Sequence, residues 1–116
     1  MTERQVQTQI MKQCGSLPHV RLFRNSVGVG WVGRHPNLTK ITFGLTPGSA
    51  DLIGWRRVAI TREMVGQDIA QFVSIEVKRP GGRVDPKQIN WRNQVERMGG
   101  LAIITHIAEE ALSELT

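Results

Sequence analysis

Apolar and polar positions along the first seventeen residues follow the spacing of a helix. Val6 and Ile10 stand one turn apart, and this spacing predicts a helix over residues 2–17. Thr2 is the expected N-cap, and glycine and proline just beyond the last turn are expected to end the helix. Because Cys14 falls on the apolar side of this helix, we expect its thiol to be buried.

Strands are predicted where apolar and polar residues alternate. HVRLFRN (19–25) and TKITFG (39–44) alternate in this way, and DLIGW (51–55) is a short apolar strand candidate. VAIT (58–61) would continue that candidate. The strongest strand pattern is IAQFVSIEVK (69–78).

That last strand divides into two different faces, because successive side chains of a strand alternate. The apolar face, which is expected to anchor the strand in a core, consists of Val73, Ile75 and Val77. The other face carries an acid and a base and consists of Ser74, Glu76 and Lys78. The Cα atoms of Glu76 and Lys78 are expected to lie roughly 6.6 Å apart. An exposed pair of this kind is usually a weak ion pair on a strand surface.

A helix is predicted directly after the glycine break that ends this strand. Asp85 has the features of an N-cap, Pro86 suits the first helical position, and Gln88 stands at the third, where it would complete a capping box. The helix is expected to run to about Met98 and to stop at the glycines that follow.

The C-terminal segments predict a parallel pair of strands. LAIIT (101–105) is an entirely apolar run typical of a buried strand, and residues 107–115 predict a last helix. A strand, a crossover helix and a second apolar strand imply parallel pairing within a mixed sheet. We therefore expect one α/β domain over residues 1–116, with the order α-β-β-β-α-β-α.

Composition narrows the functional classes. The chain has 116 residues, a length that suits one compact core, and 15 Lys and Arg against 10 Asp and Glu give a net charge of +5. A basic domain suits a polyanionic partner such as a nucleic acid. The single cysteine excludes an internal disulfide, and no signal peptide or membrane span is predicted. We expect a cytoplasmic protein, in a bacterium or a phage-infected cell.

Asp51 suggests a second interpretation of Glu76 and Lys78, namely that they belong to a metal site. An aspartate after Pro-Gly-Ser is usually a turn residue or a cap. Together with Glu76, however, it would supply two carboxylates of the kind that bind a hard divalent cation. A lysine beside them would orient a water molecule or help to deprotonate it, and a metal would stabilise charge that develops on a phosphate.

Three stretches in this order carry a family resemblance. GSADLIG (48–54), SIEVKRPGG (74–82) and PKQINWRNQVERMGG (86–100), followed by LAIIT, resemble the PD-(D/E)XK nuclease superfamily. They are most similar to its virus-type replication-repair nuclease (VRR-NUC) family, in the small standalone form found in phages and bacteria. The resemblance covers most of the chain. One departure is Ala50, which stands where the superfamily's name has proline.

The resemblance implies a restriction-endonuclease-like core and a set of site residues. Asp51 and Glu76 would bind Mg²⁺ or Mn²⁺ together with the main-chain carbonyl of Val77, Lys78 would be the catalytic lysine, and Gln88 would support the site. For Gln88, a capping box is an equally good explanation, and the two roles are compatible. Another proposed metal ligand is Glu3, although the helix dipole alone explains an acid in a first turn.

Basic side chains near the proposed site are candidates for phosphate contacts. The DNA-binding set predicted on this ground is Arg24, Asn25, Arg79, Arg83, Lys87 and Arg92. GVGWVG (28–33) spells a dinucleotide-binding pattern, but no helix is predicted after its last glycine. We interpret these glycines as a wide hairpin turn, in which Trp31 and Arg34 would at most touch DNA.

These expectations combine into a metal-dependent DNA endonuclease. The resemblance implies branched DNA as the substrate, Holliday junctions in particular, cut by a homodimer with two sites. Flaps, nicked duplex or RNA are alternative substrates. A non-catalytic nucleic-acid-binding module on the same fold is the principal rival, and a nucleotide-binding or oxidoreductase domain is disfavoured by the missing helix.

Overall fold

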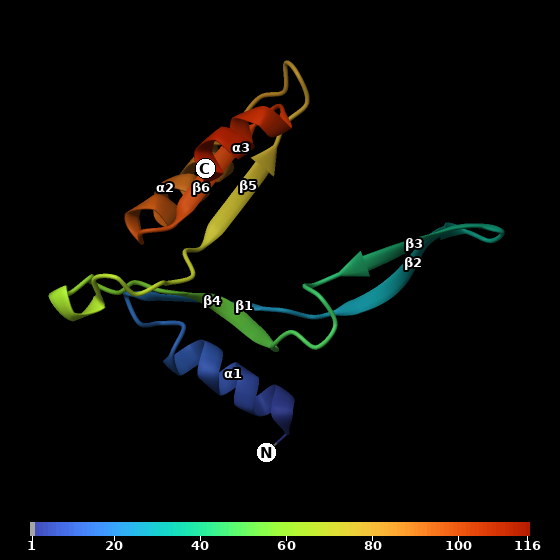
Figure 1. Cartoon of the computed structure of the whole chain (residues 1–116). Coiled ribbons are helices and arrows are strands. Elements are labelled where there is room, and N and C mark those ends of the chain that lie inside the picture. The colour runs from blue at the N-terminus through green and yellow to red at the C-terminus, as the bar shows by residue number, and fades with distance from the viewer. Residues whose placement is uncertain (1) are drawn as a thin grey trace. The chain divides into compact units, whose positions relative to one another are not determined.

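The computed structural model describes residues 2–116, and the chain divides into two compact units (Figure 1). The first unit is Met1–Arg56 and the second is Arg57–Thr116. Each unit is described by itself below. The single domain expected over residues 1–116 stays a prediction.

Helix α1 (Glu3–Gln13) opens the first unit and confirms the predicted N-cap. The Thr2 side chain accepts a hydrogen bond from the Gln5 main chain at 3.1 Å, and the Gln5 side chain accepts one in return, so the capping box is complete. The helix ends earlier than predicted, with Cys14 as its C-cap. The prediction of a buried thiol was wrong, because Cys14 stands at the C-cap of the helix and is exposed.

Strands β1 (Val20–Arg24) and β4 (Leu52–Arg56) form an antiparallel pair in the first unit. Gly54 permits the close approach of the two strands, because a Cβ atom at this position would overlap the main-chain oxygen of Arg21. The expected continuation of the strand through residues 58–61 was wrong. β4 ends at Arg56 because its partner strand begins at the paired Val20.

The glycine-rich segment 28–33 is a strand, and its interpretation as a hairpin turn was wrong. Strand β2 (Gly28–Arg34) pairs antiparallel with β3 (Asn37–Phe43), and the turn lies between Arg34 and Asn37. The ring of Phe43 covers the space that a side chain at Gly28 would fill, and Phe43 and Ile41 lie beside Gly30, which explains how a strand with glycines remains packed. The absence of a helix after Gly33 is confirmed.

The second unit is built on the predicted parallel pair. It begins with a short 3-10 helix, η1 (Arg62–Met64), and continues with β5 (Val73–Val77), α2 (Pro86–Arg97), β6 (Leu101–Thr105) and α3 (Ala108–Leu115). Strands β5 and β6 pair in parallel along all five residues of each, with α2 as the crossover, and Figure 1 shows them side by side. β5 is shorter than predicted because its partner offers only five residues to pair with.

The two faces of β5 are covered in the opposite way to the prediction. Val73, Ile75 and Val77 were expected in the core, but between 39% and 71% of their surface is exposed. Helix α2 instead contacts the polar face through hydrogen bonds to Ser74 and Glu76. The buried apolar residues of the unit are Val95 on α2 and Ala102 and Ile103 on β6.

The α/β class is confirmed, and the predicted order of elements needs one correction. Within residues 2–116 five strands precede α2, whereas the predicted order α-β-β-β-α-β-α has three. The strands of the described residues form three two-stranded sheets, two antiparallel and one parallel. The same residues contain no helix with the length and apolar character needed to cross a membrane.

The close approach at Gly54 generates a prediction for stability. Gly54→Ala should lower the free energy of unfolding by about 1–3 kcal/mol, because the added methyl group forces β1 and β4 apart. The matched control is Gly30→Ala, whose Cβ atom would meet Ile41 Cγ1 at 3.5 Å, an ordinary contact. Urea denaturation of both variants measures the difference. Equal midpoints would contradict the close approach.

Candidate active site

The Glu76 carboxylate is the centre of the candidate site in the second unit. Its Oε1 atom accepts a hydrogen bond from Gln88 Nε2 at 2.6 Å, and Lys78 Nζ lies 3.5 Å from the same oxygen. Within the described residues, Oε2 accepts no hydrogen bond. The Glu76 side chain is 42% exposed, so solvent can reach its carboxylate. One oxygen is therefore held by the protein, and the other remains available for a ligand.

The Gln88 amide makes one contact for each of the two roles considered for it. Its Oε1 accepts from the main-chain N–H of Asp85 at 2.9 Å and completes the capping box of α2. Its Nε2 donates to Glu76 from the other end of the same amide. Because the oxygen is engaged by a main-chain donor, the nitrogen must face the carboxylate. The cap of α2 thereby fixes the orientation of Glu76.

Lys78 is held beside Glu76 by the sheet itself. Its main-chain N–H donates to the Thr105 carbonyl at 2.8 Å, which extends the β5–β6 pairing by one residue. The Lys78 side chain is only 19% exposed, so it is more shielded than the carboxylate that it contacts. Thr105 is itself buried, and its hydroxyl group donates to the Ile107 carbonyl at 2.7 Å.

A cavity of about 290 Å³ lies between α2 and the β5–β6 sheet. Polar and basic side chains of α2 line it together with Glu76: Lys87, Gln88, Trp91 and Arg92. Trp91 is fixed there by a hydrogen bond from its Nε1 to Ser74 Oγ, at 3.1 Å. The candidate site is thus open at an edge that carries both acidic and basic groups.

Asp51, the second predicted carboxylate, is positioned by a network within the first unit. Its main-chain carbonyl accepts from the Asn25 N–H at 2.8 Å, and the Asn25 side chain donates to Ser49 Oγ and to the Ala50 carbonyl at 2.7 and 2.8 Å. The Asp51 side chain is exposed at the start of β4. Its convergence with Glu76, across the two units, stays a prediction.

Asn25 was predicted to contact DNA, but the structure engages its amide within the first unit. The residue is 8% exposed, and both ends of its amide are occupied: Nδ2 by the two acceptors above and Oδ1 by the N–H of Leu45 at 2.8 Å. No donor or acceptor of the amide is left to meet a phosphate. Asn25 instead closes the base of the β2–β3 hairpin and fixes the turn before Asp51.

The other predicted DNA-binding residues occupy different settings. Arg24 is exposed, and its guanidinium donates to Gln7 Oε1 at 2.9 Å and to Thr8 Oγ1 at 3.1 Å on α1. The basic residues exposed in and after the turn that follows β5 are Arg79, Arg83 and Lys87. Arg92, further along α2, is half-buried and lines the cavity.

The remaining predicted metal ligands stay predictions. Glu3 is exposed in the first turn of α1. Val77, whose carbonyl was the third expected ligand, ends β5 between the carboxylate and the lysine. Among the described residues, no three His, Cys, Asp or Glu side chains form a group that could hold a metal ion.

Two contributors to the site were missed from the sequence. Trp91 was not singled out in the predicted helix, and Thr105 was assigned to a buried strand, with no link to Glu76 or Lys78. Trp91 stands three residues after Gln88, one helical turn along, and this spacing could have indicated that it faces the same side as Gln88. The role of Thr105 depends on strand register, which the sequence does not carry for a fully apolar strand.

The donor set of the second unit fits a hard divalent cation in part. Glu76 offers one unengaged carboxylate oxygen, the ligand type that Mg²⁺ and Mn²⁺ prefer. The donors at its other oxygen keep that carboxylate from rotating away. A single carboxylate does not make a complete site, and the fit therefore depends on the second carboxylate expected from Asp51.

A strand that presents an acid and a lysine, and a helix that holds the acid through glutamine, is the arrangement expected of a PD-(D/E)XK nuclease. The family model of the VRR-NUC domain matches residues 7–108. The chain belongs to the VRR-NUC domain family, which makes it a nuclease of the PD-(D/E)XK type, a class that acts on DNA and generally uses divalent metals. No curated protein and no solved structure matches the chain.

The two contacts of Gln88 generate a prediction. Gln88→Ala should lower the free energy of unfolding by about 1–2 kcal/mol, because it removes the acceptor of the Asp85 N–H and the donor to Glu76. The matched control is Gln94→Ala on the same helix, whose side chain makes no hydrogen bond within the described residues. This control should stay within about 0.5 kcal/mol of the wild type.

Urea denaturation monitored by circular dichroism measures both variants. Gln88→Glu separates the two contacts, because it keeps an acceptor for the cap but sets a second carboxylate against Glu76. Millimolar Mg²⁺ should stabilise Gln88→Glu more than it stabilises Gln88→Ala. The bridging role of Gln88 fails if the Gln88→Ala and Gln94→Ala variants unfold at the same urea concentration.

Proposed function

We propose that the protein is a Mg²⁺- or Mn²⁺-dependent endonuclease that hydrolyses phosphodiester bonds of branched DNA, with four-way junctions as its preferred substrate. The observation that carries the proposal is the fixed Glu76 carboxylate, which has one oxygen engaged by Gln88 and Lys78 and the other open. Membership of the VRR-NUC family supports nuclease chemistry at this site.

Each residue of the site has a distinct part in this proposal. Glu76 would hold the ion through Oε2, with Asp51 and the Val77 carbonyl as further ligands. When bound, the ion would supply a Lewis acid that offsets negative charge developing on the phosphate. Gln88 would keep the Glu76 carboxylate in its orientation, which costs no reorganisation during the reaction.

Lys78 is the proposed catalytic lysine. Its ammonium group lies next to the carboxylate and is held by a shielded side chain, so it can donate a hydrogen bond to a water molecule or to a phosphate oxygen. It would orient the attacking water and assist the transfer of its proton. The leaving oxygen departs on the opposite side of the phosphorus, as in-line displacement requires.

The substrate and the assembly state form the second part of the proposal. Exposed Arg79, Arg83 and Lys87, beside the candidate site, are suited to contacts with phosphates. A homodimer would present two equivalent sites, which is what two paired incisions in a symmetric junction require. Sedimentation at assay concentration tests the dimer.

A cleavage assay with labelled four-way junction, flap and linear duplex tests the function. We expect cleavage with Mg²⁺ or Mn²⁺, fastest on the junction, and none in EDTA. Cleavage that persists in EDTA would contradict the metal mechanism. Equal rates on all three substrates would contradict the preference for branched DNA while leaving nuclease activity in place.

Lys78→Ala should lower the maximal cleavage rate on the order of 10²–10⁴-fold and leave the affinity for DNA unchanged. Lys87→Ala is the contrasting variant. It should raise the DNA concentration needed for half-maximal cleavage, because Lys87 is assigned to phosphate contact and not to chemistry. Single-turnover rates and binding in EDTA separate the two effects. A Lys78→Ala enzyme with the wild-type maximal rate would remove this residue from catalysis.

A further inference from the structure

The net charge of the protein is carried by its first unit alone. Residues 1–56 contain seven Lys and Arg against two Asp and Glu, which gives +5, whereas residues 57–116 contain eight of each and are neutral. No acid occurs between Glu3 and Asp51. The unit that holds Glu76 and Lys78 therefore contributes no net attraction to a polyanion, and the long-range attraction must come from the first unit.

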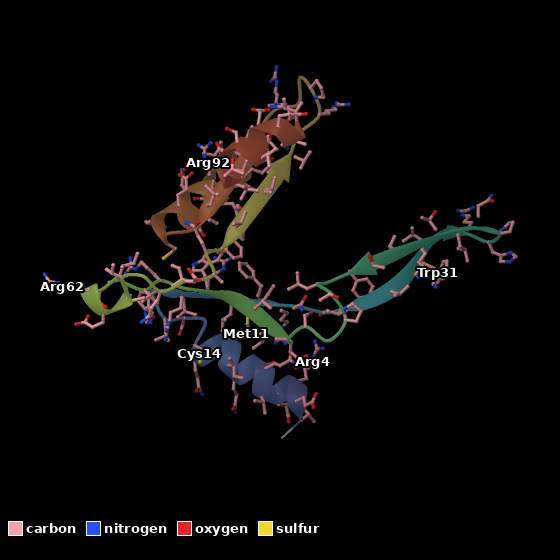
Figure 2. The ribbon with its side chains drawn as sticks, viewed as in Figure 1. Arg4, Met11, Cys14, Trp31, Arg62 and Arg92 are labelled. Atoms are coloured by element: carbon pink, nitrogen blue, oxygen red, sulfur yellow. The ribbon has the colours of Figure 1, made fainter. Side chains whose placement is uncertain are left out.

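Within this acid-free stretch, the β2–β3 hairpin is the most exposed element. Every residue of β3 is exposed, and most of β2 is exposed as well. The hairpin carries Arg34 next to its turn and Lys40 on β3, with no acidic residue between positions 28 and 43. Figure 2 shows its side chains standing out on both sides of the ribbon, with Trp31 labelled.

The register of the hairpin places an aromatic ring beside a cation on one face. Trp31 pairs directly with Lys40, so both side chains lie on the same face, and Arg34 belongs to the opposite face. Trp31 is 63% exposed. An exposed indole beside an ammonium group is suited to stacking on a base while the cation contacts a phosphate.

We propose that the β2–β3 hairpin is a DNA-binding arm that inserts at a branch point, where Trp31 stacks on an unpaired or unstacked base and Lys40 contacts the adjacent phosphate. This proposal rests on the proposed action on branched DNA and names the element that distinguishes a branch from a continuous duplex. Stacking needs an accessible base face, which a branch offers and a continuous duplex does not.

Charge favours DNA over a second copy of the chain as the occupant of this surface. Two hairpins that packed against each other would bring together cations with no acid on either ribbon to pair with them. A phosphate backbone is complementary to the same cations. A protein partner would instead contact the exposed apolar residues of the hairpin, such as Val32, which is 48% exposed. A substitution at Val32 therefore serves as the control that separates a protein partner from DNA.

The test measures DNA binding in EDTA, in the absence of cleavage, by fluorescence anisotropy with the full-length protein. Trp31→Ala should weaken binding to a four-way junction by roughly tenfold or more and leave binding to a linear duplex within about threefold. Trp31→Phe should retain part of the affinity. The matched control is Val32→Ala, adjacent in sequence but on the other face, which should bind both DNAs as the wild type does.

A second readout follows Trp31 directly. The fluorescence difference between the wild type and Trp31→Phe should be quenched by the junction and not by the duplex. Lys40→Ala should weaken both DNAs equally and reduce the salt dependence of binding by about one phosphate contact. Trp31→Ala is expected to fold, because the side chain is exposed, and circular dichroism checks this.

Two results would overturn the proposal. One is a Trp31→Ala protein that binds the junction as tightly as the wild type. The other is equal loss of affinity in Trp31→Ala and Val32→Ala together with a change in sedimentation, which would assign the hairpin to protein association. Failure of the nuclease function is separate, since a protein that cuts nothing but loses junction affinity in Trp31→Ala still has the arm.

Discussion

The hydrogen bond from the Gln88 amide to Glu76 is the interaction on which the candidate site depends. One end of this amide caps α2 at Asp85, and the other end holds the carboxylate at the end of β5. Helix stability and site geometry are therefore coupled, since a frayed first turn of α2 would free the carboxylate. The paired β6 strand adds the second constraint, because the Thr105 carbonyl fixes the main chain of Lys78.

The two units divide the work of the protein in chemically different ways. The second unit has no net charge and presents the acid, the lysine and the glutamine, whereas the first unit carries the whole net positive charge. Asn25 organises the first unit as Gln88 organises the second. Its buried amide fixes both the hairpin base at Leu45 and the turn that precedes Asp51. In each unit a side-chain amide thus links main-chain and side-chain partners from separate segments.

Local signals in the sequence were sufficient where the chemistry is local. The N-cap at Thr2 and the capping box of Asp85 and Gln88 were predicted correctly, because neighbouring residues determine them. The parallel pairing of β5 and β6 was also predicted correctly, from the order of strand, crossover helix and strand. The glycine-rich strand β2 was missed, because its packing comes from Phe43 on the partner strand. The buried hydrogen-bond network of Asn25 was missed for a similar reason. Its partners lie 20 or more positions away, and no spacing rule indicates them.

The central proposal is that the carboxylates of Glu76 and Asp51 bind one divalent ion together. The most direct measurement is anomalous scattering from crystals of the protein grown with Mn²⁺. We expect a single strong peak within coordination distance of Glu76 Oε2 and of the Asp51 carboxylate, with Gln88 still bonded to Glu76 Oε1. A manganese peak that contacts neither carboxylate, or only one of them with the other far away, would contradict the account.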